Sequence, residues 1–99
     1  MLKVVIADDE KIIRDGLKYV IDWEGNGFTI IDMVSNGREA LTACFKLKPD
    51  LLITDIIMPI MNGLELISRI KKELPDTKII ILTCHSEFKY AQEAIKLGV

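Results

Sequence analysis

The chain has 99 residues, of which 49% are hydrophobic and 28% are charged, and this is enough apolar material for the core of one small domain. The net charge of −2 at pH 7 and the pI of about 5.3 give no reason to expect that this segment binds nucleic acid or a membrane surface. No run approaches the roughly 20 apolar residues of a membrane span and no signal-peptide pattern opens the chain, so we expect a cytoplasmic protein.

The first half of the chain alternates expected strands with expected helices. Residues 3–7 are an apolar run typical of a strand. The apolar residues that follow recur at the spacing of an amphipathic helix: Ile13, Leu17, Val20 and Ile21. A glycine-punctuated loop then leads to a second expected strand at residues 28–34. Asn36 followed by Glu39 resembles a capping box, which predicts a helix from there to about residue 47.

The central run, residues 51–55, is short and almost wholly apolar, and Pro49 precedes it. Such a run is typical of a strand buried on both faces. In the loop that follows, Met58 and Met61 are expected to pack against the core. The next helix is expected to end before Pro75 and to bury one apolar face. The residues of that face are Leu64, Ile67, Ile70 and Leu74.

A fourth expected strand, residues 78–82, leads to Thr83, and a last helix follows. Ser86 is the expected N-cap of this helix, and Gly98 stands where a C-terminal cap glycine is expected. Strands that alternate with helices in this way predict an α/β fold, in which helices cover both faces of a parallel sheet.

Polar residues follow three of the expected strands at the point where each strand ends. Asp8 and Asp9 follow the first strand, Asp55 ends the third, and Thr83 comes directly after the fourth. The carboxyl ends of parallel strands meet at one edge of an open α/β sheet, and ligands bind along that edge. We therefore expect these four side chains to share one polar crevice.

This arrangement resembles the receiver domain of two-component response regulators. The features that carry the resemblance are the acidic pair, the strand-end Asp55 with Met58-Pro59 and Asn62-Gly63 after it, and the strand-end threonine. The resemblance covers residues 1–99 and implies a flavodoxin-like three-layer sandwich with strand order 2-1-3-4-5.

A narrower resemblance concerns the output domain. The loop around Trp23 and the segment from His85 to Gly98 are similar to receivers fused to AraC-type DNA-binding domains. We therefore expect an attached output domain that binds DNA and regulates transcription.

The resemblance to receivers also implies a role for each polar residue. Asp55 would accept a phosphoryl group from a phosphohistidine of a sensor histidine kinase. Mg²⁺ would be bound directly by Asp9 and Asp55, and Asp8 would act through a water molecule. The backbone carbonyl of Ile57 would supply another oxygen ligand. Thr83 would hydrogen-bond a phosphoryl oxygen and turn inward after the modification.

Phosphorylation would then act as a switch. An aspartyl phosphate adds nearly two negative charges, which shift a pre-existing two-state equilibrium toward the signalling form. The domain would take part in its own phosphorylation and dephosphorylation, but we expect a signalling protein and not an enzyme.

One part of the receiver pattern is missing from residues 1–99. Receivers have a fifth strand that ends in a lysine and a fifth helix, and neither has a counterpart here. We expect a C-terminally truncated receiver with strand order 2-1-3-4, from a longer regulator. Residues 78–82 would then form an open apolar edge, and such edges invite pairing with another chain. Self-association through this strand is therefore expected.

Two other functions fit part of the pattern. A Mg²⁺-dependent phosphohydrolase of the haloacid dehalogenase type also uses a strand-end aspartate, but Asp55 is followed by Ile56 and Ile57 and lacks the DxD arrangement. A receiver-like binding module that is never phosphorylated would be marked by a lost acid, and no acid is lost. A P-loop enzyme is excluded, because neither GxxxxGKS nor GxxxxGKT occurs.

Several of these residues also have a purely structural explanation. Asp8 and Asp9 alone would be ordinary acids near a helix start, where negative charge is favoured. The two cysteines, Cys44 and Cys84, have neither CxxC spacing nor the density of a disulfide framework, so both are expected as thiols. Cys44 is most simply a core residue.

Overall fold

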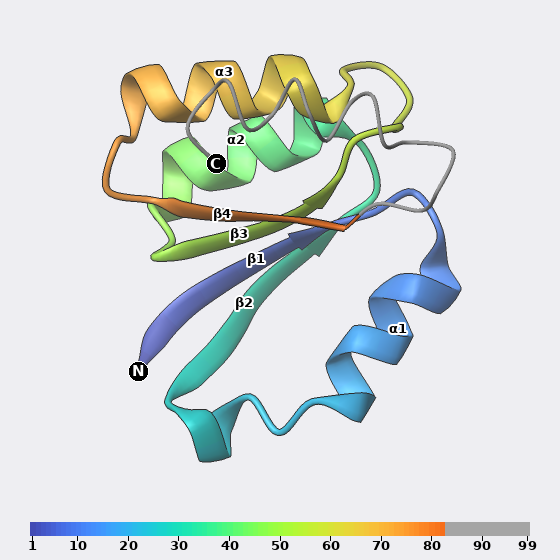
Figure 1. Cartoon of the computed structure of the whole chain (residues 1–99), viewed down its shortest axis with the longest axis vertical. Coiled ribbons are helices and arrows are strands. Elements are labelled where there is room, and N and C mark those ends of the chain that lie inside the picture. The colour runs from blue at the N-terminus through green and yellow to red at the C-terminus, as the bar shows by residue number, and fades with distance from the viewer. Residues whose placement is uncertain (83–99) are drawn as a thin grey trace.

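The computed structural model describes residues 1–82, which form one parallel sheet with helices on both sides (Figure 1). The strands are β1 (Leu2–Ala7), β2 (Phe28–Val34), β3 (Leu51–Asp55) and β4 (Lys78–Leu82). The α-helices are α1 (Lys11–Val20), α2 (Gly37–Leu47) and α3 (Gly63–Glu73). A short 3-10 turn, η1 (Glu24–Asn26), lies in the glycine-rich loop before β2. The last predicted helix, from Ser86 to Gly98, lies outside the described residues.

The sheet has the strand order β2-β1-β3-β4, and every neighbouring pair is parallel. The prediction of a flavodoxin-like order is therefore confirmed for these four strands. β1 lies in the middle, where Val5 is paired with Leu52 of β3 on one side and with Asp32 of β2 on the other. Within residues 1–82 no strand pairs with the outer edge of β4, and self-association through that edge stays a prediction.

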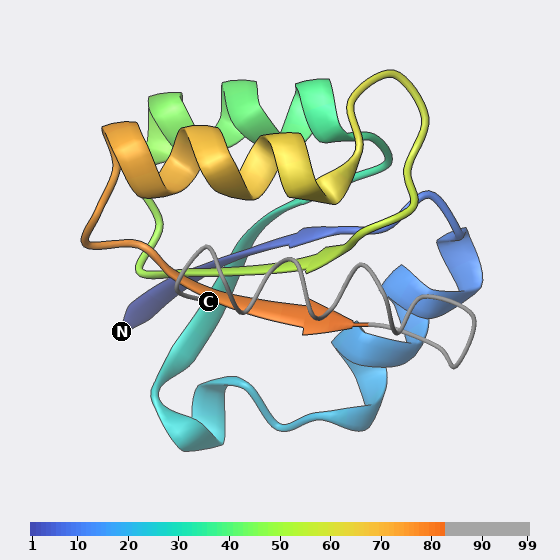
Figure 2. The same ribbon diagram turned by 45° about the horizontal axis from the view of Figure 1, so that its top comes forward.

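Helices α2 and α3 lie together over one face of the sheet, and the two views agree on this (Figures 1 and 2). The main core lies between them and the strands, with Val5, Leu52 and Ile79 from the sheet. The predicted apolar face of α3 lies against this core, and Leu66 joins it. Leu66, Ile67 and Ile70 are its fully buried residues, whereas Leu64 and Leu74 are only partly buried. Leu66 is a fully buried side chain of this helix that the sequence pattern did not predict.

Helix α1 lies on the opposite face and is much less buried. None of its ten residues is buried, and Val20 is 83% exposed. Leu17 alone packs against the small cluster of Val4, Ile6 and Ile53. The predicted helix is thus confirmed, and of the predicted apolar stripe of Ile13, Leu17, Val20 and Ile21 only Leu17 packs against the sheet. Only the inner edge of the helix reaches the sheet, and no other described element packs on its remaining apolar surface.

Two asparagines start the helices of the well-packed face. The side-chain oxygen of Asn36 accepts a hydrogen bond from the amide of Glu39 at 2.8 Å, as the capping pattern predicted. Asn62 caps α3 by accepting a hydrogen bond from the amide of Glu65 at 3.0 Å, a cap that was not among the sequence predictions. A capping box also predicts a hydrogen bond from the amide of Asn36 to the side chain of Glu39, and here the donor is the preceding residue instead. Oε1 of Glu39 accepts from the amide and the hydroxyl of Ser35 rather than from the amide of Asn36.

The buried thiol of Cys44 is part of this core, as predicted. Burial, helped by the charge of Asp32, raises the pKa of the thiol from 9.0 to about 12. Cys44 therefore stays protonated at neutral pH and packs as a small apolar side chain. Within residues 1–82, no helix has both the length and the hydropathy to cross a membrane.

Candidate functional site

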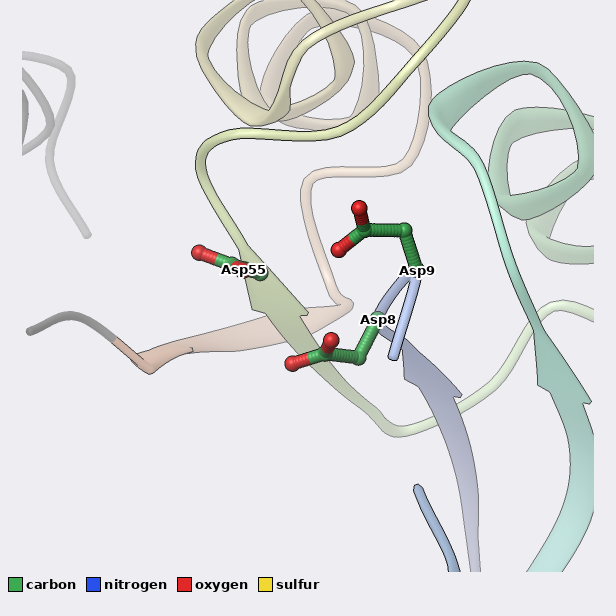
Figure 3. Close-up of side chains that lie close together, drawn as sticks. All are labelled: Asp8, Asp9 and Asp55. Atoms are coloured by element: carbon green, nitrogen blue, oxygen red, sulfur yellow. The ribbon is translucent and has the colours of Figure 1, made fainter. Parts of the chain in front are cut away.

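Three carboxylates gather at the carboxyl ends of β1 and β3 (Figure 3). Asp8, Asp9 and Asp55 can each direct one oxygen so that these atoms lie within 4.8 Å of one another. The sheet register explains the meeting, because Ala7 of β1 is paired with Thr54 of β3 and the acids come directly after these residues. The structure thus brings together the three acids that the sequence placed at strand ends.

Asp8 is the most enclosed of the three, with 3% of its surface exposed. Its Oδ1 atom accepts a hydrogen bond from the amide of Glu10 at 2.9 Å. Burial raises the pKa of the Asp8 carboxyl group above 3.8, the hydrogen bond from Glu10 opposes this, and the negative charge of Asp55 adds to the rise. A cation next to Asp8 would therefore stabilise the ionised form of this carboxylate.

Asp55 and Asp9 are more accessible. Asp55 is half-buried, and its Oδ1 atom accepts a hydrogen bond from the amide of Ile56 at 2.7 Å. The side chain of Asp9 is exposed and accepts no hydrogen bond from residues 1–82. Together with Asp8, the cluster therefore has several oxygen atoms that the described part of the protein leaves free for a ligand.

The loop after Asp55 follows a tightly constrained path. The amide of Gly63 donates to the carbonyl of Ile56 at 2.6 Å, and a side chain at position 63 would overlap the backbone oxygen of Asp55. Near the C-terminal end of this loop, a side chain at position 37 of α2 would overlap the backbone oxygen of Met61. Gly63 and Gly37 therefore allow α3 and α2 to start in contact with the loop that leaves the acidic cluster.

The apolar residues of this loop have different surroundings. Met58 is buried and Met61 packs against the core, as expected. The side chain of Ile57 is 45% exposed and that of Ile60 is 75% exposed. Ile60 also has φ of 70°, a left-handed conformation that a β-branched residue rarely adopts.

The buried residue before Asp55 was not identified from the sequence. Thr54 is completely buried, and its hydroxyl group donates to the backbone oxygen of Asp55 at 2.8 Å. An apolar strand interrupted by a threonine directly before the acid was the available signal. Thr83 lies outside the described residues, but its neighbour Leu82 is paired with Asp55 across β3 and β4.

The donor set suits a hard divalent cation. Carboxylate oxygens are the ligands that Mg²⁺ and Mn²⁺ prefer, whereas a zinc site normally includes histidine or cysteine. No histidine or cysteine among residues 1–82 belongs to the cluster of Asp8, Asp9 and Asp55. The clustered and mutually repelling carboxylates of these three acids therefore fit a Mg²⁺ ion bound at the carboxyl-end edge of the sheet.

Comparisons with known proteins agree with one another. The sequence model described as the response regulator receiver domain matches residues 4–99. The chain is 43% identical over 99 residues to the uncharacterized transcriptional regulatory protein YesN of Bacillus subtilis, covering all of this chain and 27% of YesN. It thus spans about a quarter of the length of that relative, and 45% of the length of another, YdfI of the same species.

Two solved structures are similar in fold and sequence. The REC domain of AraT, a response regulator from Geobacillus stearothermophilus, superposes with a TM-score of 0.93 at 43% identity, covering 97% of this chain and 74% of that one. A two-component transcriptional regulator AraC from Clostridium phytofermentans gives a TM-score of 0.88 at 40% identity, with the same coverage.

Proposed function

Because this chain belongs to the response regulator receiver domain family, we propose that Asp55 is its phosphoacceptor. The family assignment removes the haloacid dehalogenase alternative, and the chain is a receiver of the kind found in two-component transcriptional regulators. The observation that carries the proposal is the cluster of Asp8, Asp9 and Asp55 at one edge of the sheet.

In this proposal the three acids have different roles. Asp9 and Asp55 would hold Mg²⁺ directly, Asp8 would act through water, and the backbone carbonyl of Ile57 would be a further ligand. The bound ion would offset the negative charge that otherwise keeps a phosphoryl group away from a carboxylate. The amide of Ile56, 2.7 Å from Oδ1 of Asp55, orients the accepting carboxylate.

The proposed reaction is a phosphoryl transfer from a phosphohistidine of a sensor histidine kinase in the cytoplasm. A carboxylate oxygen of Asp55 attacks the phosphorus atom and forms a new P–O bond. The P–N bond breaks, and its electron pair returns to the imidazole nitrogen. Thr83 would hydrogen-bond a phosphoryl oxygen, and the added charge would shift the domain toward a conformation read by an attached output domain, which we propose binds DNA.

Phosphorylation by a small phosphodonor tests this proposal. The protein is treated with acetyl phosphate and Mg²⁺, and the modified residue is located by mass spectrometry. We expect one phosphoryl group, on Asp55, and none in Asp55→Asn. Asp76→Asn, an exposed acid in the turn before β4, is the matched control and should be modified like the wild type.

The result that would overturn the proposal is equally specific. A wild-type protein that binds Mg²⁺ but is not modified by acetyl phosphate or by a phosphorylated kinase would be a binding module with a receiver fold. Modification of the Asp55→Asn variant to the same extent would place the phosphoacceptor elsewhere.

A further inference from the structure

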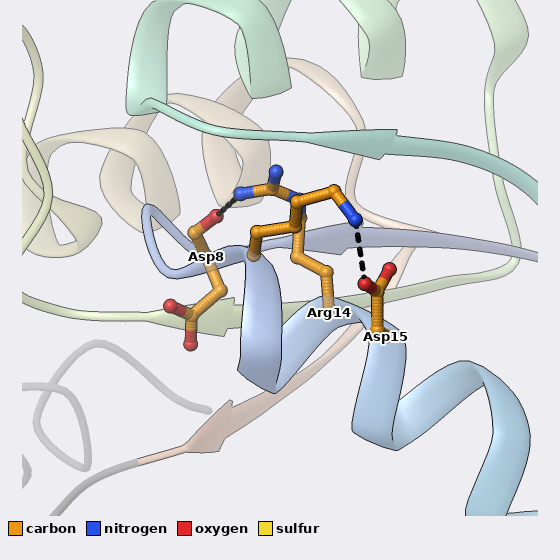
Figure 4. Close-up of polar contacts among 4 residues, drawn as sticks. Asp8, Arg14 and Asp15 are labelled. Atoms are coloured by element: carbon orange, nitrogen blue, oxygen red, sulfur yellow. Dashed lines mark hydrogen bonds and ion pairs between the residues drawn. The ribbon is translucent and has the colours of Figure 1, made fainter.

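Arg14, in the first half of α1, contacts the backbone between two of the acids. Its Nη1 atom donates a hydrogen bond to the backbone oxygen of Asp8 at 2.7 Å (Figure 4). The side chain is half-buried, and within residues 1–82 it forms no ion pair with a carboxylate. A guanidinium group close to several acids thus binds a neutral carbonyl oxygen instead.

That carbonyl belongs to the peptide group that joins Asp8 to Asp9. The amide of Asp8 donates to the backbone oxygen of Val34 at 3.1 Å, and its carboxylate accepts from the amide of Glu10 at 2.9 Å. The bond from Arg14 is the third constraint on this segment. It is made to the carbonyl oxygen of the peptide group whose amide belongs to Asp9. Asp9 has no hydrogen bond from residues 1–82 that would hold its side chain independently.

Lys11, on the same helix as Arg14, forms an ordinary ion pair at the protein surface. Lys11 forms an ion pair with Asp15 at 2.8 Å, and these side chains are 79% and 40% exposed. Such pairs contribute little to stability and orient nothing beyond themselves. Arg14 differs because it reaches from the helix to the end of β1, on a helix that has no buried residue of its own.

We infer that Arg14 is a positioning residue for the metal site, because its hydrogen bond to the Asp8 carbonyl holds the carboxylates of Asp8 and Asp9 toward Asp55. This inference rests on the proposed function, in which the three acids bind Mg²⁺. Partners that orient metal ligands in this way typically change metal affinity by about 10- to 100-fold when they are removed.

Whether the Mg²⁺ affinity rises or falls when Arg14 is replaced distinguishes a positioning role of this residue from a purely electrostatic one. Removing a positive charge near a cation site reduces repulsion, so a purely electrostatic role predicts tighter Mg²⁺ binding in Arg14→Met. A positioning role predicts weaker binding, with a Kd raised roughly 10-fold. Lys11→Met removes the same charge from the same helix and should not weaken binding. Arg14→Lys keeps a charged donor and should restore most of the affinity.

The experiment is a calorimetric titration of each variant with Mg²⁺, together with NMR spectra of the metal-free proteins. The amide of Asp9 is part of the peptide that Arg14 holds, so its resonance should move in Arg14→Met and stay in place in Lys11→Met. Should Arg14→Met not fold, Arg14→Gln takes its place with the same expected results.

Each outcome decides a different question. Unchanged or tighter Mg²⁺ binding in a folded Arg14 variant overturns the positioning role and leaves the proposed function intact. A wild-type protein that does not bind Mg²⁺ overturns the metal site of the proposed function, and the role of Arg14 with it.

Discussion

The two edges of the sheet use aspartate in opposite ways. At the edge formed by the amino ends of the strands, Asp50 accepts a hydrogen bond from the amide of Lys3 at 2.7 Å. Its own backbone bonds to Lys3 on one side and to Lys78 on the other, each at 2.9 Å. At the carboxyl-end edge, three carboxylates lie close together and receive only two hydrogen bonds from residues 1–82, both from backbone amides.

The difference lies in the partners and not in the residue type. Asp50 precedes β3 and lies between β1 and β4, whose backbone groups satisfy it. Asp8, Asp9 and Asp55 stand where the strands have ended, and no cationic side chain within residues 1–82 pairs with them. A carboxylate with partners stabilises the fold, whereas clustered carboxylates without partners destabilise it until a cation binds.

The largest expected effect tests the carboxyl-end edge. Mg²⁺ at about a hundred times its Kd should raise the free energy of unfolding by roughly 2.7 kcal/mol. Asp9→Ala should lose most of this gain, because one carboxylate of the site is gone. Asp50→Asn, at the other edge, should keep it. Urea unfolding with and without MgCl₂ measures the gain, and equal gains in wild type and Asp9→Ala would contradict the proposed site.

The next effect tests the amino-end edge. Asp50→Ala removes a charge-assisted hydrogen bond and leaves the amide of Lys3 without its acceptor, so it should cost about 2 kcal/mol of stability. Asp76→Ala, at an exposed acid in the turn before β4, is the control and should change stability little. Chemical denaturation without Mg²⁺ gives both values. If Asp50→Ala costs no more than Asp76→Ala, the two edges do not differ as described.

A smaller effect of opposite sign is expected for Asp55→Asn in the absence of metal. Removing one of three mutually repelling charges should raise the free energy of unfolding by about 1 kcal/mol, since exposure to solvent weakens the repulsion. Thermal melting in EDTA measures this gain. In saturating Mg²⁺ the wild type should melt above Asp55→Asn, because the ion stabilises the wild type more than the variant. A variant that melts below the wild type in EDTA would show that the cluster is not strained.

Backbone strain gives a comparison between two exposed positions. Ile60, in the loop beside the acids, has φ of 70°, and Lys48, at the C-terminal cap of α2, has φ of 47°. Ile60→Gly should stabilise the protein by about 0.5 to 1 kcal/mol, because a β-branched side chain is strained in the left-handed region. Lys48→Gly should gain less. Equal gains from the two substitutions, measured by urea unfolding, would show that branching at Cβ adds no strain here.

The smallest expected effect is a pH dependence due to Asp8. Its pKa in the folded protein is raised above 3.8, mainly by burial, so the folded state keeps the proton to higher pH than the unfolded state does. As pH rises from 3.8 through the folded-state pKa, the contribution of Asp8 to the free energy of unfolding therefore falls. Asp8→Asn should remove this decrease. Unfolding curves of both proteins across this range in EDTA check it, and parallel pH profiles would exclude it.

Much of the secondary structure was predictable from short-range patterns. The apolar runs and the helical spacings gave the strands and helices to within a few residues. The start of α2 at Asn36 and the core position of Cys44 were also correct. These features depend on residues that lie within a few positions of one another, where the geometry of a helix or a strand alone determines which side chains meet. The meeting of Asp8, Asp9 and Asp55 followed as well, because parallel strands end at the same edge.

The remaining features are contacts between segments far apart in the chain. The exposure of α1, the burial of Leu66, the close approach of Gly37 to Met61 and the partners of Asp50 depend on how the helices and loops pack on the finished sheet. The bond from Arg14 to the Asp8 carbonyl spans only six residues, but it exists because α1 folds back beside the end of β1. No local pattern marks such contacts, since each one needs the position of both partners. The sequence by itself therefore determined which residues form the acidic edge, and only the tertiary structure decided what holds them there.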